Sequence, residues 1–174
     1  MWMRRGKQVE VPSPGQNQKV AAFGGINYAT GESLSHVPNV AKGGKNSAQF
    51  LVWLWKLVAH ARRRRRKVIL LIDNGPIHTA KKVEAFLEEP AIKKLIKVEW
   101  LPKYAPDLND QERVWKFVKE HGVANVLFAG RDNLRDHVIK LLDAINRDPK
   151  AMMTIVLGQR HRASHIRKKI LGGT

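Results

Sequence analysis

The spacing of apolar residues predicts a long helix in the first third of the chain. Between residues 50 and 61 apolar side chains recur every three or four positions, which places them on one helical face. Asn46 or Ser47, just ahead of this stretch, can cap the helix. The residues expected to face the core are Phe50, Leu51, Leu54, Leu57, Val58 and Ala61.

Shorter apolar runs separated by turn residues predict the strands. Residues 19–28 and 32–37 flank an Ala-Thr-Gly turn and predict a hairpin. The run KVILLID at 67–73 predicts a buried strand, and IKVEWLP at 96–102 predicts a short second one. Further helices are expected over about 79–87, 109–119 and 132–145. This order predicts an α/β domain with a mixed sheet flanked by helices.

The charge balance points to a polyanionic partner. Lysine and arginine number 32 against 15 acidic residues, giving a formal net charge of +17. Because the basic residues are spread along the whole chain, nucleic acid is favoured over a membrane surface. The longest apolar stretch, residues 50–59, is broken by Lys56 and is too short to cross a bilayer, and no secretory signal follows the start, so a cytoplasmic protein is expected. The absence of cysteine excludes disulfides and cysteine-ligated metal sites.

Two acids follow the two strands expected after the long helix. Asp73 ends the apolar run 69–72, and Glu112 follows the strand 96–102 and its proline-containing loop. A structural interpretation is available for each: Asp73 can cap a turn, and Glu112 can form a capping box with Asn109. If one sheet brings the acids together, two carboxylates about 4 Å apart repel by about 4 kcal/mol at an effective dielectric of 20. Mg²⁺, or Mn²⁺, would offset this repulsion, and such ions near phosphate favour phosphodiester cleavage.

The two motifs also resemble a known family. DNGPIHTAKKV at 73–83 together with LPKYAPDLNDQERVWKFVK at 101–119 is similar to the DDE endonuclease domain of mariner-like bacterial insertion-sequence transposases. The resemblance covers about residues 2–120 and implies a ribonuclease H-like fold, DNA transposition and a magnesium-dependent site. It implies that Asp73 is the second metal-binding acid and Glu112 the third. The family usually has Pro-Ile where this chain has Asp110 and Gln111, so Asp110 and Asp107 remain lesser candidates for the third ligand.

Other residues of the two motifs are candidates for supporting roles. Asn74, His78 and Asn109 are expected near the acids, and His78 can orient a phosphate or a carboxylate or can simply stabilise a turn. The run Arg62–Arg66 lies seven residues before Asp73, roughly 23 Å along a strand, so it is expected to bind flanking DNA or to remain solvated. The basic residues expected nearer the cleaved strand are Lys81, Lys82, Lys103, Arg113, Lys116 and Lys119.

The first acid of the family has no match in this chain. In the family that aspartate lies on the first strand, upstream of the tryptophan that matches Trp2, whereas only Glu10 and Glu32 are acidic before Asp73 here. We therefore expect little or no strand cleavage by this chain alone. In the ribonuclease H-like fold the first strand is central, so its absence would leave unpaired edges open to aggregation or to completion by another chain. Residues 1–150 are expected to form this incomplete domain and 151–174 a basic tail.

Three functions remain open at this stage. The first is a metal-dependent transposase domain that cuts and joins DNA, inactive in this form. The second is a non-catalytic DNA-binding remnant that binds transposon ends or associates with itself or with an intact transposase. The third is a basic RNA-binding module. All three place the protein with nucleic acid, and the first two place it at the bacterial nucleoid.

Overall fold

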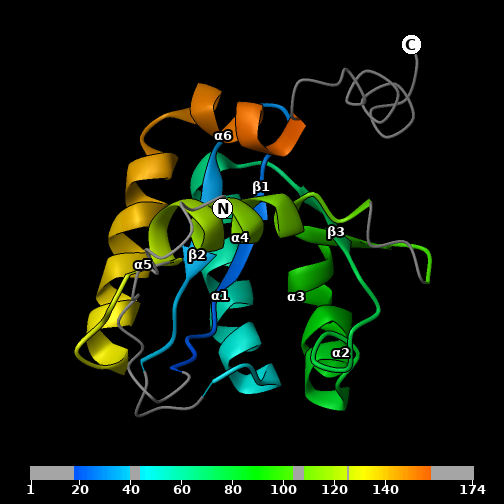
Figure 1. The fold of residues 1–174 in the computed structure, drawn as a ribbon. Helices are drawn as coiled ribbons and strands as arrows, with labels where there is room; N and C mark the ends of the chain where they lie inside the picture. Colours follow the sequence, from blue (N-terminus) through cyan, green and yellow to red (C-terminus); the bar gives the residue numbers. More distant parts are fainter. Residues whose placement is uncertain (1–17, 40–43, 104–107, 125, 158–174) are drawn as a thin grey trace, which may run out of the picture.

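The computed structural model describes residues 18–39, 44–103, 108–124 and 126–157. These residues form short strands and helices; in the view of Figure 1, α2 and α3 lie on the right, α5 on the left, α1 between them and α6 at the top. In chain order the elements are β1 (Phe23–Ile26), β2 (Ser33–His36), α1 (Ser47–Arg64), β3 (Val68–Ile72), α2 (Lys81–Glu88), α3 (Pro90–Lys93), β4 (Ile96–Trp100), α4 (Gln111–Val118), the π-helix η3 (Lys119–Val123), α5 (Arg131–Asn146) and α6 (Pro149–Leu157).

The strands of the described residues form two separate pairs. β1 and β2 form an antiparallel hairpin in which Phe23 lies opposite His36. β3 and β4 run parallel, with Val68 opposite Ile96 and Ile72 opposite Trp100. The mixed α/β class is confirmed and is compatible with a ribonuclease H-like fold. The single sheet expected from the sequence is instead two two-stranded sheets, because β1 and β3 do not pair with each other.

The helix α1 is fixed at both ends by local interactions. The Asn46 side chain accepts a hydrogen bond from the Gln49 N–H at 3.0 Å, which satisfies one unpaired donor of the first turn. At the other end Arg65 adopts a left-handed conformation, with φ of 50°. Its N–H and that of Arg66 bond back to carbonyl groups of the last turn. These interactions fix the ends of the helix at Ser47 and Arg64.

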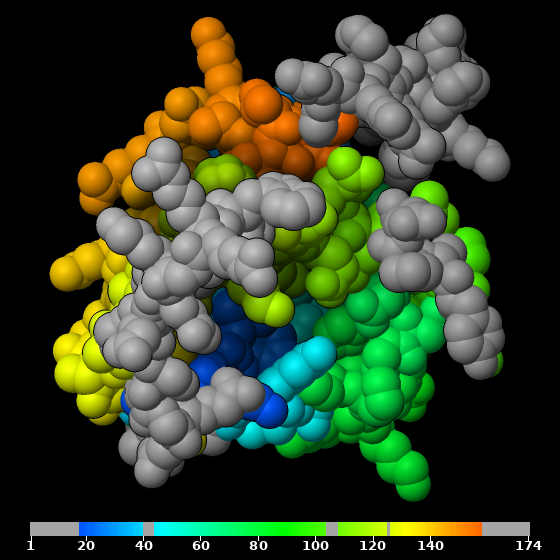
Figure 2. Space-filling view, in the orientation of Figure 1, coloured from blue at the N-terminus to red at the C-terminus, as the bar shows by residue number. Residues whose placement is uncertain are grey.

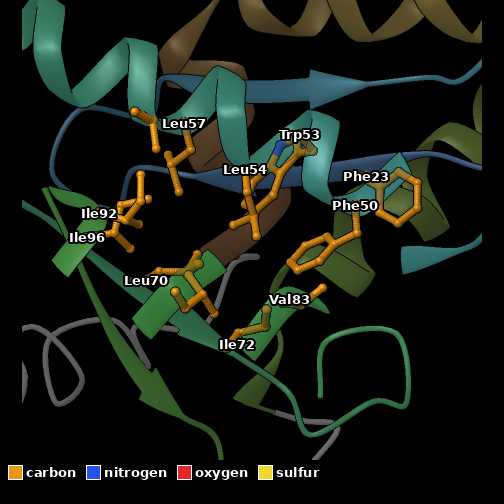
Figure 3. Close-up of a cluster of buried hydrophobic side chains, with 12 residues drawn as sticks. Phe23, Phe50, Trp53, Leu54, Leu57, Leu70, Ile72, Val83, Ile92 and Ile96 are labelled. Atoms are coloured by element: carbon orange, nitrogen blue, oxygen red, sulfur yellow. The ribbon is translucent and has the colours of Figure 1, made fainter. Parts of the chain in front are cut away.

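The apolar face of α1 packs on the β3–β4 sheet. In Figure 3 Leu54 and Leu57 project from the helix toward Leu70 and Ile72 of β3. Full burial of a leucine contributes about 2 kcal/mol, so this face accounts for the position of the helix. We call this cluster the α1 core; its buried members are Phe23, Phe50, Trp53, Leu54, Leu57, Val58, Leu70, Ile72, Val83, Leu87, Ile92 and Ile96.

A second cluster lies among the later helices. It joins α4, α5 and α6 with Val37, which follows β2. Gly122 lets η3 approach α5, because a Cβ at this position would overlap Leu141 Cδ1. We call this cluster the α5 core; its buried members are Val37, Val114, Val118, Leu134, Val138, Leu142, Ile145, Met152 and Val156.

Most elements expected from the sequence are present, with shifted ends. The hairpin, α1, β3, α2, β4, α4 and α5 are confirmed, while α3, η3 and α6 were not expected. The helix α6 runs through the expected boundary at residue 150, and Met152 and Val156 are buried in the α5 core. Residues 151–157 are thus part of the folded body, and the basic tail remains a prediction for residues 158–174, which lie outside the described ranges.

Candidate active site

Asp73 lies immediately after β3, at the carboxyl end of the strand. One carboxylate oxygen, Oδ1, accepts a hydrogen bond from the Gly75 N–H at 2.9 Å and lies 2.7 Å from His78 Nδ1. The other oxygen, Oδ2, accepts from Asn109 Nδ2 at 3.3 Å. The side chain is 44% exposed, so the carboxylate remains accessible to solvent while three groups fix its orientation.

The turn after Asp73 is shaped to hold this carboxylate. A Cβ on Gly75 would lie 2.9 Å from Asp73 Oδ1, so only glycine allows the N–H to approach this closely. The His78 ring packs against Phe50 with centroids 4.5 Å apart, which sets the position of the imidazole. The structure thus places the His78 ring beside the Asp73 carboxylate. Asn74 points elsewhere, donating to the Leu101 carbonyl at 2.6 Å and so joining the ends of β3 and β4.

Asn109 connects Asp73 to the helix that carries Glu112. The helix α4 begins at Gln111 with Asp110 as its N-cap residue, and no side chain caps it. The capping box that Asn109 and Glu112 could have formed is absent, since α4 has Asp110 as its N-cap residue and no side-chain cap. The Asn109 side-chain amide donates to Asp73. Glu112 lies exposed in the first turn of α4, where its carboxylate makes no hydrogen bond or ion pair with another described residue.

Asp110, a lesser candidate for the third acid, is occupied by other partners. Its Oδ2 accepts from the Tyr28 hydroxyl at 3.2 Å, and its Oδ1 lies 3.1 Å from Arg113 Nε. Burial, and then the negative charge of Asp110, raise the pKa of Tyr28 well above its ordinary value. This pair joins the loop after β1 to the start of α4. Asp107, the other lesser candidate, lies outside the described residues.

The described carboxylates do not form a complete metal site. Asp73 and Glu112 line one cavity and offer the oxygen ligands that Mg²⁺ and Mn²⁺ prefer. Within the described ranges, however, no three His, Cys, Asp or Glu side chains are grouped closely enough to hold a metal ion. Both oxygens of Asp73 also already accept hydrogen bonds. The described residues therefore do not make up a metal site by themselves.

The arginine run lies at the opposite end of β3 from Asp73. Arg62, Arg63 and Arg64 form the last turn of α1, and Arg65 and Arg66 precede β3. All five side chains are exposed, and Arg64 forms an ion pair with Glu32. The run therefore lies one strand length away from Asp73, as expected from the sequence.

The remaining basic candidates divide into two groups. Arg113 and Lys119 line the cavity that Asp73 and Glu112 share, as does Lys45, which the sequence did not single out. Lys81, Lys82, Lys103 and Lys116 are exposed on the surface and do not line this cavity. Lys45 lies in the loop before α1 and belongs to neither motif. Only the folded structure shows that it lines the cavity.

Comparison with known proteins identifies the family. Residues 1–135 match the family model described as DDE superfamily endonuclease. The chain therefore belongs to the DDE endonuclease superfamily, whose members generally use divalent metal ions. The match covers β1 through the first turns of α5 and includes both Asp73 and Glu112.

A curated relative is an insertion-element protein. The chain is 34% identical over 115 residues to the insertion element IS630 uncharacterized 39 kDa protein of Shigella sonnei. The aligned segment covers 66% of this chain and 31% of the relative, so the chain spans about a third of the relative's length. No solved structure matches the chain significantly. In the described residues, no helix is both long and apolar enough to cross a membrane.

Proposed function

We propose that this chain is the DNA-processing part of a transposase, which cleaves and joins phosphodiester bonds at transposon ends. Asp73 and Glu112 are two of the acids that bind its catalytic Mg²⁺ or Mn²⁺. Membership of the DDE superfamily and similarity to an insertion-element protein support this function. The single observation that carries it is the hydrogen bond from Asn109 to Asp73, which links the two motifs across 36 positions of sequence.

The chain's own residues fix the position of one acid and attract the substrate. Gly75, His78 and Asn109 hold the Asp73 carboxylate in one orientation, which preorganises it for a cation or a phosphate-bound ion. The net charge of +17 attracts DNA over distances comparable to the Debye length. Because the described ligand set is incomplete, the chain alone binds DNA without cutting it.

A second function, a non-catalytic DNA-binding remnant, is favoured by one observation. A DNA-binding role needs no group of three metal ligands, and the described residues contain none. In that case the basic surface still binds transposon ends, while Asp73 keeps only a structural role in the turn with Gly75 and His78.

Metal-dependent DNA affinity separates the two functions. Mg²⁺-type ions are commonly held by one or two carboxylates together with substrate phosphates. We expect Mn²⁺ to tighten binding of a transposon-end duplex about tenfold, equivalent to about 1.4 kcal/mol, as measured by fluorescence anisotropy. Asp73→Asn should remove this effect, whereas Asp143→Asn, an exposed acid of α5, should retain it.

The other outcomes have clear meanings. Equal DNA affinity with and without Mn²⁺ in the unaltered chain would favour the remnant. Cleavage of the duplex by the chain alone would contradict the proposed inactivity. A marked preference for RNA of the same length would overturn both DNA functions and favour the RNA-binding module.

A further inference from the structure

The side of α1 that points away from its buried face combines apolar and cationic residues. Residues 52, 55, 59, 62 and 63 follow one another at three- and four-residue spacing, so they share one face of the helix. All of them are exposed, whereas the exposed face of a helix is normally polar throughout. We call this surface the α1 outer face; its members are Val52, Trp55, Ala59, Arg62 and Arg63.

The α1 outer face is separate from the candidate active site. None of its members lines the cavity that Asp73 and Glu112 share, and α1 contributes to that cavity from its other side, for example with Trp53 and Leu57. Figure 2 shows the face of the molecule that carries α4, and little of α1 is visible there. The α1 outer face therefore needs an explanation other than the cavity.

Trp55 presents a large aromatic ring that a neighbour holds in place. The indole packs against Phe86 of α2, with ring centroids 5.0 Å apart and an interplanar angle of 69°. This edge contact restricts the indole, yet Trp55 remains 53% exposed. A flat ring that is both restrained and exposed can stack with another flat ring, as aromatic side chains do with nucleobases.

The carboxyl end of the same face is cationic. The sequence of α1 contains no acidic residue, and Arg62 and Arg63 are exposed in its last turn. Arg62 follows Trp55 by seven residues, which is about 10 Å along the helix axis. Stacked nucleotides of one DNA strand rise about 3.4 Å each, so about three nucleotides span this distance. One short strand can thus reach both the indole and the arginines.

The composition of this face favours nucleic acid over a protein partner. A stable protein interface uses about 20–30 residues on each side, whereas Val52 and Trp55 are the only large apolar members of this face. Proteins that bind single strands combine aromatic rings for the bases with cations for the phosphates. The bases of a double helix stack on one another, so they offer no free face to an indole. The α1 outer face therefore fits an unpaired strand.

We propose that the α1 outer face binds an unpaired DNA strand, with one base stacked on Trp55 and phosphates on Arg62 and Arg63. The site rests on the exposed ring and the arginines, and the choice of DNA rests on the proposed function. Phe50, five residues before Trp55, packs on His78 beside Asp73. A strand unpaired near Asp73 has to extend only about 7.5 Å further along the helix axis to reach Trp55.

Two single strands of equal charge test the base contact. One is a labelled oligothymidine of about twelve nucleotides, and the other has the same length and backbone but no bases. The unaltered chain should bind the oligothymidine about tenfold more tightly in fluorescence anisotropy, equivalent to about 1.4 kcal/mol. Equal affinity for the two strands, or binding of neither, would overturn the proposal.

Variants of Trp55 connect this preference to the indole. Trp55→Leu should reduce the preference to less than about twofold, and Trp55→Phe should retain most of it. Leu127→Ala removes another exposed apolar side chain, in the loop before α5, and should leave the preference intact. If Trp55→Leu does not fold, the strand without bases and Trp55→Phe decide. A full preference in folded Trp55→Leu would overturn the role of the indole.

The arginines are tested through salt dependence. Each phosphate contact to a single strand contributes about 0.7 to the slope of log affinity against log salt. Replacing Arg62 and Arg63 together by glutamine should lower the slope by about 1.4 for both strands and leave the base preference unchanged. An unchanged slope would overturn the assignment of phosphates to these two side chains.

Further outcomes separate this site from the proposed function. Trp55→Leu should keep the Mn²⁺-dependent binding of duplex DNA. Loss of the base preference with that Mn²⁺ effect intact in the unaltered chain would overturn the α1 site alone, and the reverse result would overturn the metal role of Asp73 alone. Tighter binding of oligouridine than of oligothymidine would overturn the choice of DNA. Self-association that Trp55→Leu abolishes would show that the face binds a second copy and would overturn base stacking.

Discussion

At the level of single residues, Gly31 joins the hairpin to the last described helix. Its φ is +75°, and a Cβ here would lie 2.5 Å from the Pro149 carbonyl oxygen at the start of α6. Both the left-handed backbone and the contact with another backbone atom oppose any side chain. Gly31→Ala should therefore lower the free energy of unfolding by about 2 kcal/mol or more, measured by chemical denaturation.

Gly44 provides the matched control for this substitution. A Cβ at Gly44 would meet no atom within 4 Å, and its backbone has no positive φ. Gly44→Ala should change stability by less than about 1 kcal/mol, with a slight gain expected from the less flexible unfolded chain. Similar losses in both variants would show that the Pro149 contact is not what constrains Gly31.

His36 makes stability depend on pH. Burial lowers its pKa below the ordinary value of 6.5, the nearby charges of Lys56 and Arg135 lower it further, and a hydrogen bond with Gln49 opposes the shift. Because the folded state gives up this proton more readily than the unfolded state, the unfolded state binds more protons in acid. The contribution of His36 to the free energy of unfolding is fully present above pH 6.5 and is lost as the pH falls toward the pKa of His36 in the folded state.

The measurement compares unfolding midpoints at about pH 7.5 and about pH 5.5. The unaltered chain should be less stable at the lower pH. His36→Phe keeps an aromatic ring beside Phe23, with which His36 stacks, but cannot titrate, so its two midpoints should differ less. An identical pH difference in both proteins would assign the effect to other histidines.

The sequence located the two candidate acids but not their partners. Asp73 and Glu112 could be recognised because each follows a predicted strand and lies within one of the two family motifs. The hydrogen bond from Asn109 to Asp73 and that from Tyr28 to Asp110 join residues 36 and 82 positions apart. Local patterns carry no information about such pairs. The local pattern allowed a capping box at Asn109, whereas in the structure its side chain makes a tertiary hydrogen bond to Asp73.

At the level of elements, α1 tests whether local signals fix a helix start. Asn46 and Ser47 were equal candidates for the cap, and the Asn46 side chain fulfils the role. Asn46→Ala should cost about 1 kcal/mol of unfolding free energy, because the Gln49 N–H loses its acceptor. Ser47→Ala should cost almost nothing, and a larger loss from Ser47→Ala than from Asn46→Ala in denaturation would contradict the assigned cap.

Elements with a clear polar and apolar period were predicted, and the others were missed. α1 and α5 bury every third or fourth residue, so their periodicity is strong. α6 has a largely apolar sequence, PKAMMTIVL, so apolar and polar residues do not alternate with a helical period. α3 spans only Pro90–Lys93, which is too short to show a period. The split between the two sheets depends on which strands pair, and that is decided by contacts far apart in sequence.

At the level of the whole molecule, the positive charge and the exposed arginines determine how the chain meets DNA. Each phosphate neutralised by a cationic side chain contributes about 0.9 to the slope of log affinity against log salt. Arg62, Arg63 and Arg66 are exposed, whereas the Arg64 side chain pairs with Glu32 and Arg65 holds the left-handed conformation that ends α1. These three side chains are therefore the ones to remove.

Replacing Arg62, Arg63 and Arg66 together by glutamine should reduce the salt slope of DNA binding by about 2.7 if all three contact phosphates. Fluorescence anisotropy between about 50 and 200 mM salt measures this slope. A triple replacement of Lys140, Arg147 and Lys150 removes the same charge from α5, the turn after it and α6, where we expect a much smaller change. Equal changes in both triples would mean that the chain attracts DNA through its overall charge, because only a localised binding surface makes the position of a lysine or arginine matter.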